Sequence, residues 1–249
     1  MSSSWPDALW LIRHGESAGN RARDDAEAHG HAVIEIAERD IDVPLSDLGR
    51  RQAASVGIWI GDMDPRQQPT SVLVSPYVRA EQTADIVLRQ AGLDHLPRLI
   101  DERLREREFG ILDGLTSRGI RERFPEEANR RARLGKFYHR PPGGESWADV
   151  IKRLRDIVHE IGRDFPGERV LVVAHQVVVL LFRYVLEQMS EREILDLDKA
   201  AEIANCSLTR FEFDVTERRL VLQAWNTKSP LVDEGEIVTS EPDAAAGPR

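Results

Sequence analysis

The chain has 249 residues, of which 41% are hydrophobic and 31% charged, and its formal net charge is −9. This length allows one large α/β domain or two small ones, and the acidic balance argues against nonspecific binding to nucleic acids or membranes. No apolar run approaches the roughly 20 residues that a membrane helix needs. The N-terminal residues lack a secretory signal pattern, and the one cysteine, Cys206, cannot form an internal disulfide. We therefore expect a cytoplasmic protein.

The first sixty residues predict a strand, a helix, an excursion and a second helix. Ala8–Arg13 is an apolar run that stops at charged and turn-forming residues, which is typical of a buried strand. Glu16–Ala28 is polar and helix-like. It leads into a charged stretch, and we expect an irregular excursion or lid over about residues 21–42. A helix capped by Ser46 should then run to about residue 60, because apolar residues recur along one side.

Further elements follow the same alternation. Thr70–Ser75 is β-branched and ends before a proline, so it predicts a second strand, and Arg79–Gln90 predicts a helix. Arg98–Leu104 is predicted to be a short strand. The high charge density over about residues 116–140 indicates a helical lid of two exposed helices broken at Pro125.

The last third of the chain predicts a helix, a strand and a hairpin. Glu145–Asp164 has apolar residues at helical spacing, and Arg169–Ala174 is strongly β-branched, with an apolar helix after it. Ser207–Asp214 and Arg218–Trp225 resemble a closing hairpin.

Strands that alternate with helices imply a parallel sheet covered on both faces. We therefore predict an α/β fold with a mostly parallel central sheet and helices on both faces, in a single domain over residues 1–232. Residues 233–249 are rich in Glu, Ala, Pro and Gly and are predicted to form a disordered tail.

Three predicted strands lead to cationic or nucleophilic side chains. Arg13 and His14 end the first strand, and His175 follows the third β-branched run. Arg79 lies a few residues beyond the second. Ligands of open α/β sheets bind outside the carboxyl ends of the strands, so these four side chains should meet in one pocket. Such a cluster requires an anion to neutralise it.

A histidine that is neutral near pH 7 can act as a nucleophile, and arginine offers a planar fork that suits phosphate oxygens. A divalent metal is the competing interpretation of paired histidines, but two adjacent arginines would repel it. No His-x-x-x-His pair or carboxylate triad surrounds these histidines in the sequence. We therefore predict an anion site without metal or cofactor. A histidine that merely ends a strand and bonds to the backbone is the structural alternative.

The segment Arg13-His14-Gly15-Glu16-Ser17, with Asn20 beyond it, resembles the signature of the histidine phosphatase superfamily, the phosphoglycerate-mutase-like proteins. More motifs follow in the family's order over roughly residues 9–214. They are Asp42-Val43-Pro44-Leu45-Ser46-Asp47-Leu48-Gly49, Ser75-Pro76-Tyr77-Val78-Arg79, Glu106-Arg107-Glu108-Phe109-Gly110, Gly143-Gly144-Glu145-Ser146 and Val172-Val173-Ala174-His175.

The resemblance implies a covalent mechanism. His14 would attack phosphorus and become a phosphohistidine, and Glu106 would protonate the leaving alkoxide and then accept a proton from water. Glu106 lies in a charge run whose ordinary interpretation is a solvated face. Only its place four residues before Gly110, as in the family, selects it over Glu102 or Glu108.

The resemblance also implies the groups that bind the phosphoryl oxygens. Arg13, Arg79 and His175 would hold the nonbridging oxygens and stabilise their developing charge, and Asn20 would add a neutral donor. These cationic side chains would do the work that a metal does elsewhere.

Departures from the family pattern favour hydrolysis, in which water captures the phosphoryl group, over the return of that group to the bound substrate. Phe109 and Ser117 stand where the mutases carry a Tyr and a Lys for the substrate carboxylate. Gln176 follows His175, and this pair resembles the fructose-2,6-bisphosphatase branch. The mutases carry a Gly at the position after that His.

Lys136 and Arg140 resemble residues with which that branch holds a second phosphate or sugar hydroxyls, although Ser117 and Ala132 depart from it. The two cations could instead only solvate a helix end.

The sequence therefore predicts a metal-independent phosphomonoester hydrolase of the histidine acid phosphatase type that acts on a small phosphorylated metabolite. A cofactor-dependent phosphoglycerate mutase and a catalytically inactive phosphate-binding module are the alternatives. The expected partner is a small-molecule phosphate ester, with no nucleic acid and no membrane, and the sequence leaves a homodimer open.

Overall fold

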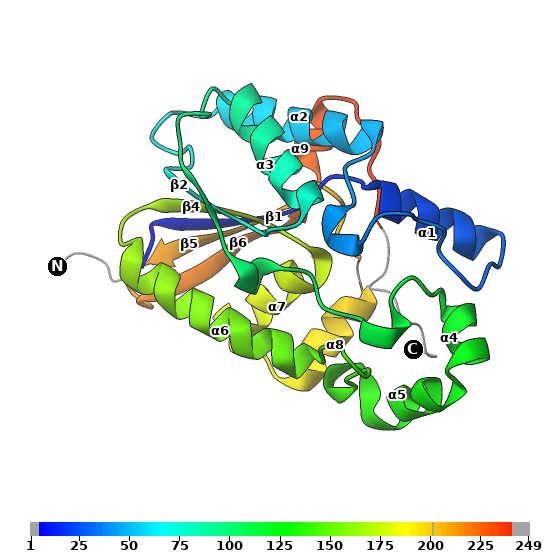
Figure 1. The fold of residues 1–249 in the computed structure, drawn as a ribbon. Helices are drawn as coiled ribbons and strands as arrows, with labels where there is room; N and C mark the ends of the chain where they lie inside the picture. Colours follow the sequence, from blue (N-terminus) through cyan, green and yellow to red (C-terminus); the bar gives the residue numbers. More distant parts are fainter. Residues whose placement is uncertain (1–4, 201, 241–249) are drawn as a thin grey trace.

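One β-sheet forms the centre of the fold, and across residues 5–200 and 202–240, which the computed structural model describes, six strands build it. The strand order is β3-β2-β4-β1-β5-β6 (Figure 1). Strands β1 to β4 are parallel, whereas β5 is antiparallel to β1 and β6 is antiparallel to β5. The predicted α/β fold with a mostly parallel sheet is confirmed. The strands are β1 (Ala8–Arg13), β2 (Ser71–Val74), β3 (Arg98–Ile100), β4 (Arg169–Ala174), β5 (Leu208–Asp214) and β6 (Arg219–Thr227).

Helices cover both faces of the sheet, with α2 and α3 on one side and α6 and α7 on the other (Figure 1). Helices α1, α4 and α5 lie beyond one end of the sheet. The α-helices are α1 (Ala18–Ala28), α2 (Asp47–Gly61), α3 (Val78–Gln90), α4 (Ser117–Arg123), α5 (Pro125–Tyr138), α6 (Trp147–Asp164), α7 (Gln176–Leu186), α8 (Glu191–Ala200) and α9 (Ser229–Asp233). Short 3-10 helices are η1 (Asp40–Asp42), η2 (Glu102–Leu104) and η3 (Gly110–Leu112).

Strand β1 is apolar because it is buried on both faces. Successive side chains of a strand point to opposite faces. Trp10 and Ile12 therefore pack in the cluster that includes α2 and α3, and Leu9 and Leu11 pack in the cluster that includes α6 and α7.

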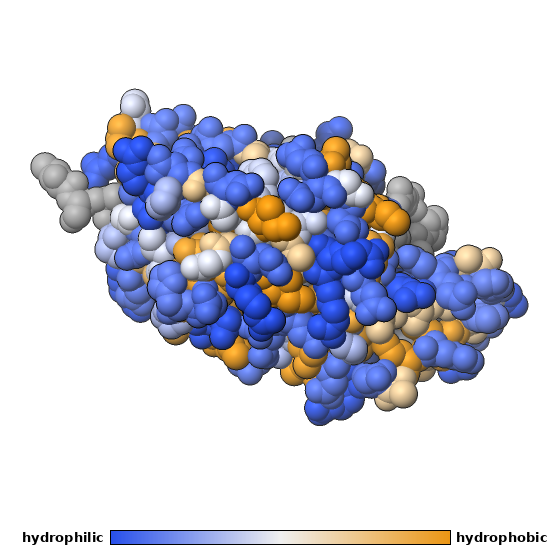
Figure 2. All heavy atoms as spheres, turned by 90° about the horizontal axis from the view of Figure 1, so that it is seen from above, coloured by the Kyte–Doolittle hydropathy of each residue, from blue (hydrophilic) through white to orange (hydrophobic). Residues whose placement is uncertain are grey.

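Among the described residues on the face shown in Figure 2, hydrophobic side chains lie in small patches among hydrophilic ones.

One predicted strand is shorter in the structure, and one helix of the structure was not predicted. Strand β3 ends at Ile100, because Asp101 accepts a hydrogen bond from the backbone of Arg103 (2.8 Å) and starts η2. Helix α8 was not predicted, although Ser190 and Glu193 carry the capping-box signal for it.

Backbone hydrogen bonds join the predicted excursion to the start of the predicted lid. After α1 the chain is irregular up to η1, and the backbone N–H of Ile34 donates to the Gly114 carbonyl (2.9 Å). The Thr116 N–H donates in turn to the Ala32 carbonyl (3.2 Å). Helices α4 and α5 meet at Pro125. The excursion and the start of the lid are therefore one hydrogen-bonded unit.

The first part of the predicted tail, up to residue 240, packs on the body. Arg51 forms an ion pair with Glu236 (3.2 Å), and Gln52 Nε2 donates to the Ile237 carbonyl (2.8 Å). The Asn205 N–H donates to the Thr239 carbonyl (2.8 Å). This segment lies on the body, where its backbone carbonyls accept hydrogen bonds from Gln52 of α2 and from Asn205. Residues 241–249 of the predicted tail lie outside the described residues. Within the described ranges no helix is long and apolar enough to cross a membrane.

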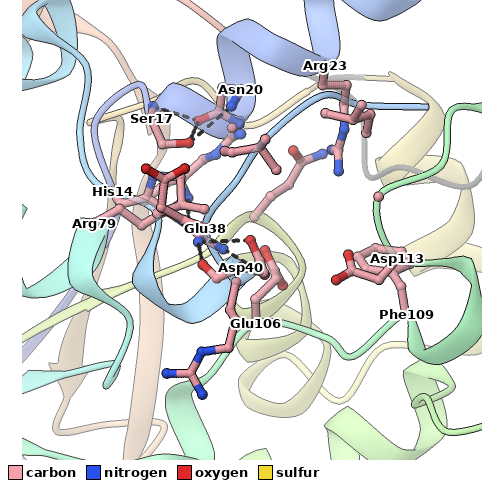
Figure 3. Close-up of a pocket in the computed structure, with 18 residues that line it drawn as sticks. His14, Ser17, Asn20, Arg23, Glu38, Asp40, Arg79, Glu106, Phe109 and Asp113 are labelled. Carbon is pink, nitrogen blue, oxygen red and sulfur yellow. Dashed lines mark hydrogen bonds and ion pairs between the residues drawn. The ribbon is translucent and has the colours of Figure 1, made fainter. Parts of the chain in front are cut away.

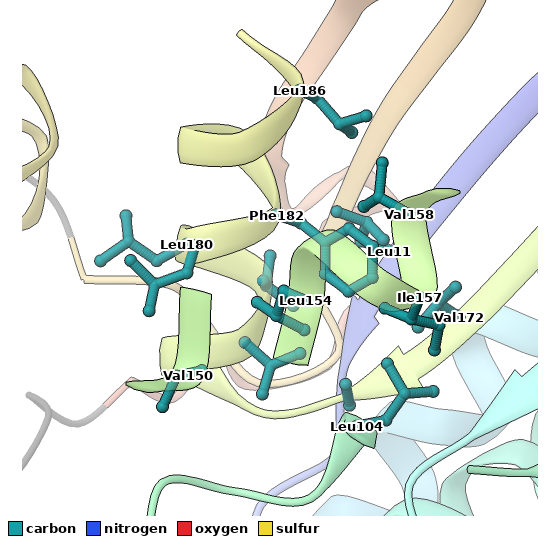
Figure 4. Packing of buried hydrophobic residues seen from close by; sticks show 14 of the residues in the cluster. Leu11, Leu104, Val150, Leu154, Ile157, Val158, Val172, Leu180, Phe182 and Leu186 are labelled. Carbon is teal, nitrogen blue, oxygen red and sulfur yellow. The ribbon is translucent and has the colours of Figure 1, made fainter. Parts of the chain in front are cut away.

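Leu154 of α6 lies at the centre of the larger core cluster (Figure 4) and has no exposed surface. Leu154→Ala should lower the free energy of unfolding by about 2–5 kcal/mol, because it removes buried methyl groups and leaves a cavity. The same change at Leu134, which is half exposed, should alter it by less than about 0.5 kcal/mol. Urea unfolding of both variants checks this, and equal losses would contradict the assignment of the core.

Candidate active site

The carboxyl ends of β1, β2 and β4 meet at one edge of the sheet, because Arg13 pairs with Ala174 and Val74 with Val173. His14 follows β1 and His175 follows β4. Their ring centroids lie 5.1 Å apart.

Arg79, in the first turn of α3, points its Nε at His14 Nε2 over 3.3 Å. The structure thus brings together the two histidines and an arginine that lie far apart in the chain. Figure 3 shows His14 and Arg79 side by side at the pocket.

His14 is buried and neutral. Its Nδ1 lies 2.7 Å from the carbonyl oxygen of Gly15, which accepts the ring proton and leaves Nε2 with a lone pair. Burial, and then the charges of Arg79 and Arg13, hold the pKa of His14 well below its usual range. A neutral imidazole with a free lone pair on Nε2 can act as a nucleophile, and the guanidinium that faces it can bind an anion.

The loop that carries His14 is fixed by a close approach of two backbones. A Cβ on Gly49 would lie 2.0 Å from the Glu16 carbonyl oxygen, so only glycine fits at this position. Ser46, the cap of α2, donates to the Glu16 carboxylate (2.5 Å). The segment before α2 therefore holds the loop after β1 in place.

Asn20 lies in the first turn of α1, whose cap is Ser17. The Asn20 Oδ1 accepts hydrogen bonds from the Ser17 backbone N–H (2.9 Å) and hydroxyl (2.8 Å). With Oδ1 engaged by the cap, the amide N–H groups of Asn20 are left for a ligand, and Asn20 lines the pocket. The capping box therefore sets the orientation of this side chain.

His175 is fully buried. The hydroxyl of Ser75, at the end of β2, lies 2.7 Å from its Nε2, and its Nδ1 has no hydrogen-bond partner. Burial, followed by the charges of Arg79 and His14, holds the pKa of His175 well below its usual range. If Ser75 donates to Nε2, the proton lies on Nδ1, which needs an acceptor such as an oxyanion. Sequence reasoning gave Ser75 no role, although its place at a strand end before a proline was a signal for one.

Glu106 lies next to this unpartnered nitrogen. Its Oε2 is 4.0 Å from His175 Nδ1, its side chain is 15% exposed, and it lines the pocket. Arg153 of α6 donates to the backbone carbonyls of Glu106 (3.3 Å) and Arg103 and so holds the loop. Because of this anchoring Glu106 turns inward, whereas Glu108 is exposed.

The remaining predicted residues fall into two groups. Arg13 and Gln176, the first residue of α7, line the pocket. Lys136 and Arg140 do not line it. Lys136 Nζ forms an ion pair with Asp198 (2.7 Å) and lies over the Trp147 ring, and Arg140 forms an ion pair with an aspartate of α6.

Residues in and directly after the excursion, together with residues of the loop before the lid, complete the pocket. Apolar side chains come from Ile34, Ile36, Val43 and Phe109, and charged ones from Arg23, Glu38, Arg39, Asp40 and Asp113. Figure 3 shows Arg23 and Asp113 at some distance from His14 within the same cavity. Sequence reasoning missed Arg23, because it lies in no recognisable motif, whereas Asp40 belongs to the excursion that could set specificity. In the described part of the chain no group of three or more His, Cys, Asp or Glu residues could hold a metal ion.

A family model of the histidine phosphatase superfamily, branch 1, matches residues 9–228. This chain belongs to the histidine phosphatase superfamily. It is 30% identical over 226 residues to phosphoglycerate mutase-like protein 4 of Arabidopsis thaliana, covering 90% of this chain and 87% of that protein. The superfamily resemblance read from the motifs is confirmed.

Two more similarities concern phosphatases. A Caenorhabditis elegans 6-phosphofructo-2-kinase/fructose-2,6-bisphosphatase is 30% identical over 193 residues, which are 77% of this chain and 36% of that protein. The solved structure of a mycobacterial glucosyl-3-phosphoglycerate phosphatase with inorganic phosphate matches with a TM-score of 0.67 and 27% identity, over 90% of this chain and 99% of that one. The superfamily and these neighbours support phosphatase or mutase chemistry.

Burial of a neutral His14 makes stability depend on pH. Below about pH 6.5 the unfolded chain takes up a proton at this position that the folded chain does not, so the free energy of unfolding falls as the pH falls. The difference between wild type and His14→Ala should therefore fall by about 1.4 kcal/mol per pH unit below about pH 6.5, until the lowered pKa is reached. Urea unfolding at several pH values measures it, and a difference that does not change with pH would contradict the burial of a neutral ring.

Proposed function

We propose that this protein is a metal-independent phosphomonoesterase that acts on a small phosphorylated metabolite through a phosphohistidine at His14. The observation that carries the proposal is the buried, neutral imidazole whose Nε2 lies 3.3 Å from the Arg79 guanidinium. A second imidazole, that of His175, lies 5.1 Å away. Nucleophile and oxyanion donors are thus within the span of one phosphoryl group.

In the first step His14 Nε2 forms a bond to phosphorus and the bond from phosphorus to the ester oxygen breaks. Glu106 gives its proton to that oxygen, so the alcohol leaves neutral. Arg13, Arg79 and His175 stabilise the charge on the nonbridging oxygens, an effect worth on the order of 2.7–4 kcal/mol for each donor.

In the second step water attacks phosphorus and the phosphorus–nitrogen bond breaks. Glu106, now ionised, takes a proton from the water, and inorganic phosphate leaves while His14 returns to its neutral form. Both steps use the same donors, so one site serves both halves of the reaction.

The pocket supports a leaving group with both apolar and hydroxyl surfaces. Phe109 and Ile36 line it together with the carboxylates of Glu38 and Asp113. Two similar proteins are named for action on fructose 2,6-bisphosphate and glucosyl-3-phosphoglycerate, which are phosphorylated sugars or sugar derivatives. We propose a sugar phosphate or a related small ester in the cytoplasm.

Lys136 and Arg140 have no part in the proposal. Acidic residues engage both cations outside the pocket, so a second phosphate held by them has no structural support.

A phosphoglycerate mutase is the second candidate, favoured by the similarity to the Arabidopsis mutase-like protein. Phe109 lines the pocket without a hydroxyl, and Ser117 is engaged through its backbone N–H by Glu27 (3.2 Å). The side chains with which mutases hold a substrate carboxylate are therefore not at these positions, which favours release of phosphate to water.

His14→Ala should lose hydrolysis of p-nitrophenyl phosphate to the background rate, because no nucleophile is left. His29→Ala is the matched control: His29 is exposed at the C-cap of α1, outside the pocket, and its loss should leave the rate unchanged. The wild-type rate should be the same with and without a chelator. A strict need for a divalent ion would contradict the mechanism, and no turnover by wild type would favour a phosphate-binding module.

Supplied with 3-phosphoglycerate and 2,3-bisphosphoglycerate, the wild-type protein should release inorganic phosphate and form no 2-phosphoglycerate, because water captures the phosphohistidine. Phosphorus NMR of the mixture separates these products. Isomerisation at a rate comparable with phosphate release would establish the mutase instead.

A further inference from the structure

Arg79 is occupied by a carboxylate from the excursion. Its two terminal nitrogens lie 3.0 and 3.2 Å from the Asp40 carboxylate oxygens, and Nη1 also donates to the Asp40 backbone carbonyl (2.5 Å). Its Nε faces His14 Nε2 (3.3 Å). Each nitrogen of this guanidinium is therefore engaged, and the two terminal ones by Asp40.

A phosphoryl group on His14 would need the same donors. Arginine binds phosphate and carboxylate through the same fork of N–H groups, so the two anions compete for one face. The phosphoryl group and the Asp40 carboxylate also repel each other, because both are negative. Water screens this repulsion little here, since the Arg79 side chain is only 6% exposed. Asp40 therefore stands where the substrate's phosphoryl oxygens would be bound.

We propose that the Asp40 carboxylate is an internal competitor for the phosphoryl site, which the substrate displaces from Arg79 and which returns as inorganic phosphate leaves. The inference rests on the proposed function and names a residue that sets the affinity of the site for phosphate. A hydrolase gains from such a residue because its product is the anion that must leave.

The local geometry allows this exchange without unfolding. The Asp40 side chain is 42% exposed and lies in η1, so its carboxylate can rotate into water. The backbone carbonyl of Asp40 would still accept from Arg79 and keep the guanidinium oriented. The carboxylate is thus the displaceable half of a two-part contact.

The contact also has a fixed support. The excursion that carries Asp40 is bonded to the start of the lid through Ala32 and Thr116 (3.2 Å), and Val43, just beyond η1, is buried. Asp40 is therefore held at the pocket by ordered chain on both sides.

The test compares Asp40→Asn and Asp40→Ser with Asp42→Asn. Asp40→Asn and Asp40→Ser both remove the charge and keep the backbone carbonyl. Asp40→Ser keeps the test decisive if Asp40→Asn does not fold. Asp42 lies in the same 3-10 helix, outside the pocket, and pairs with Arg39 (2.6 Å), a residue of the pocket rim whose side chain is 81% exposed, so its change removes the same charge from the same turn. Calorimetric titration with inorganic phosphate gives the dissociation constant without turnover, and product inhibition of p-nitrophenyl phosphate hydrolysis gives a second value.

Both Asp40 variants should bind phosphate about tenfold more tightly than wild type, a change of about 1.4 kcal/mol, with stronger product inhibition. Asp42→Asn should stay within about twofold of wild type. Unchanged or weaker phosphate binding in the Asp40 variants, or a lower kcat with weaker binding, would overturn the inference and make Asp40 a positioning residue. Phosphate binding by none of the chains, wild type included, would overturn the proposed function as well.

Discussion

The suppression of positive charge on His14 is the constraint on which the site depends. Burial disfavours the imidazolium, and the guanidiniums of Arg79 and Arg13 disfavour it further. Those two arginines are also the groups that would hold a phosphoryl group. In the proposed mechanism one pair of cations therefore keeps the nucleophile neutral and also binds the phosphoryl group.

Buried cations need partners of their own while no anion is bound. Arg13 donates to the Ile203 backbone carbonyl (2.5 Å), and Arg79 is paired with Asp40. In the proposed cycle the carboxylate and the phosphate take turns on Arg79, so its charge is compensated in both states. The excursion contains few motif residues, but in this cycle its Asp40 would compensate the charge of Arg79.

Distant motifs are coupled through backbone packing. Gly49 is required because the Glu16 carbonyl lies against it, and Ser46 caps α2 while bonding to the Glu16 side chain. Arg153 of α6 holds the backbone of the Glu106 loop in the same way. Motifs that lie far apart along the chain thus fix one pocket through their contacts.

The sequence by itself determined the sheet and the inner site. Apolar runs and the side chains that follow them are local patterns, and parallel strands necessarily bring their carboxyl ends together, so His14, Arg79 and His175 could be placed in one pocket. Only the tertiary structure decided which charges pair. Asp40 pairs with Arg79, Glu106 points into the pocket, and Lys136 pairs with Asp198. These contacts depend on where the excursion, the lid and α8 lie in space. No periodicity or spacing along the chain encodes those distances.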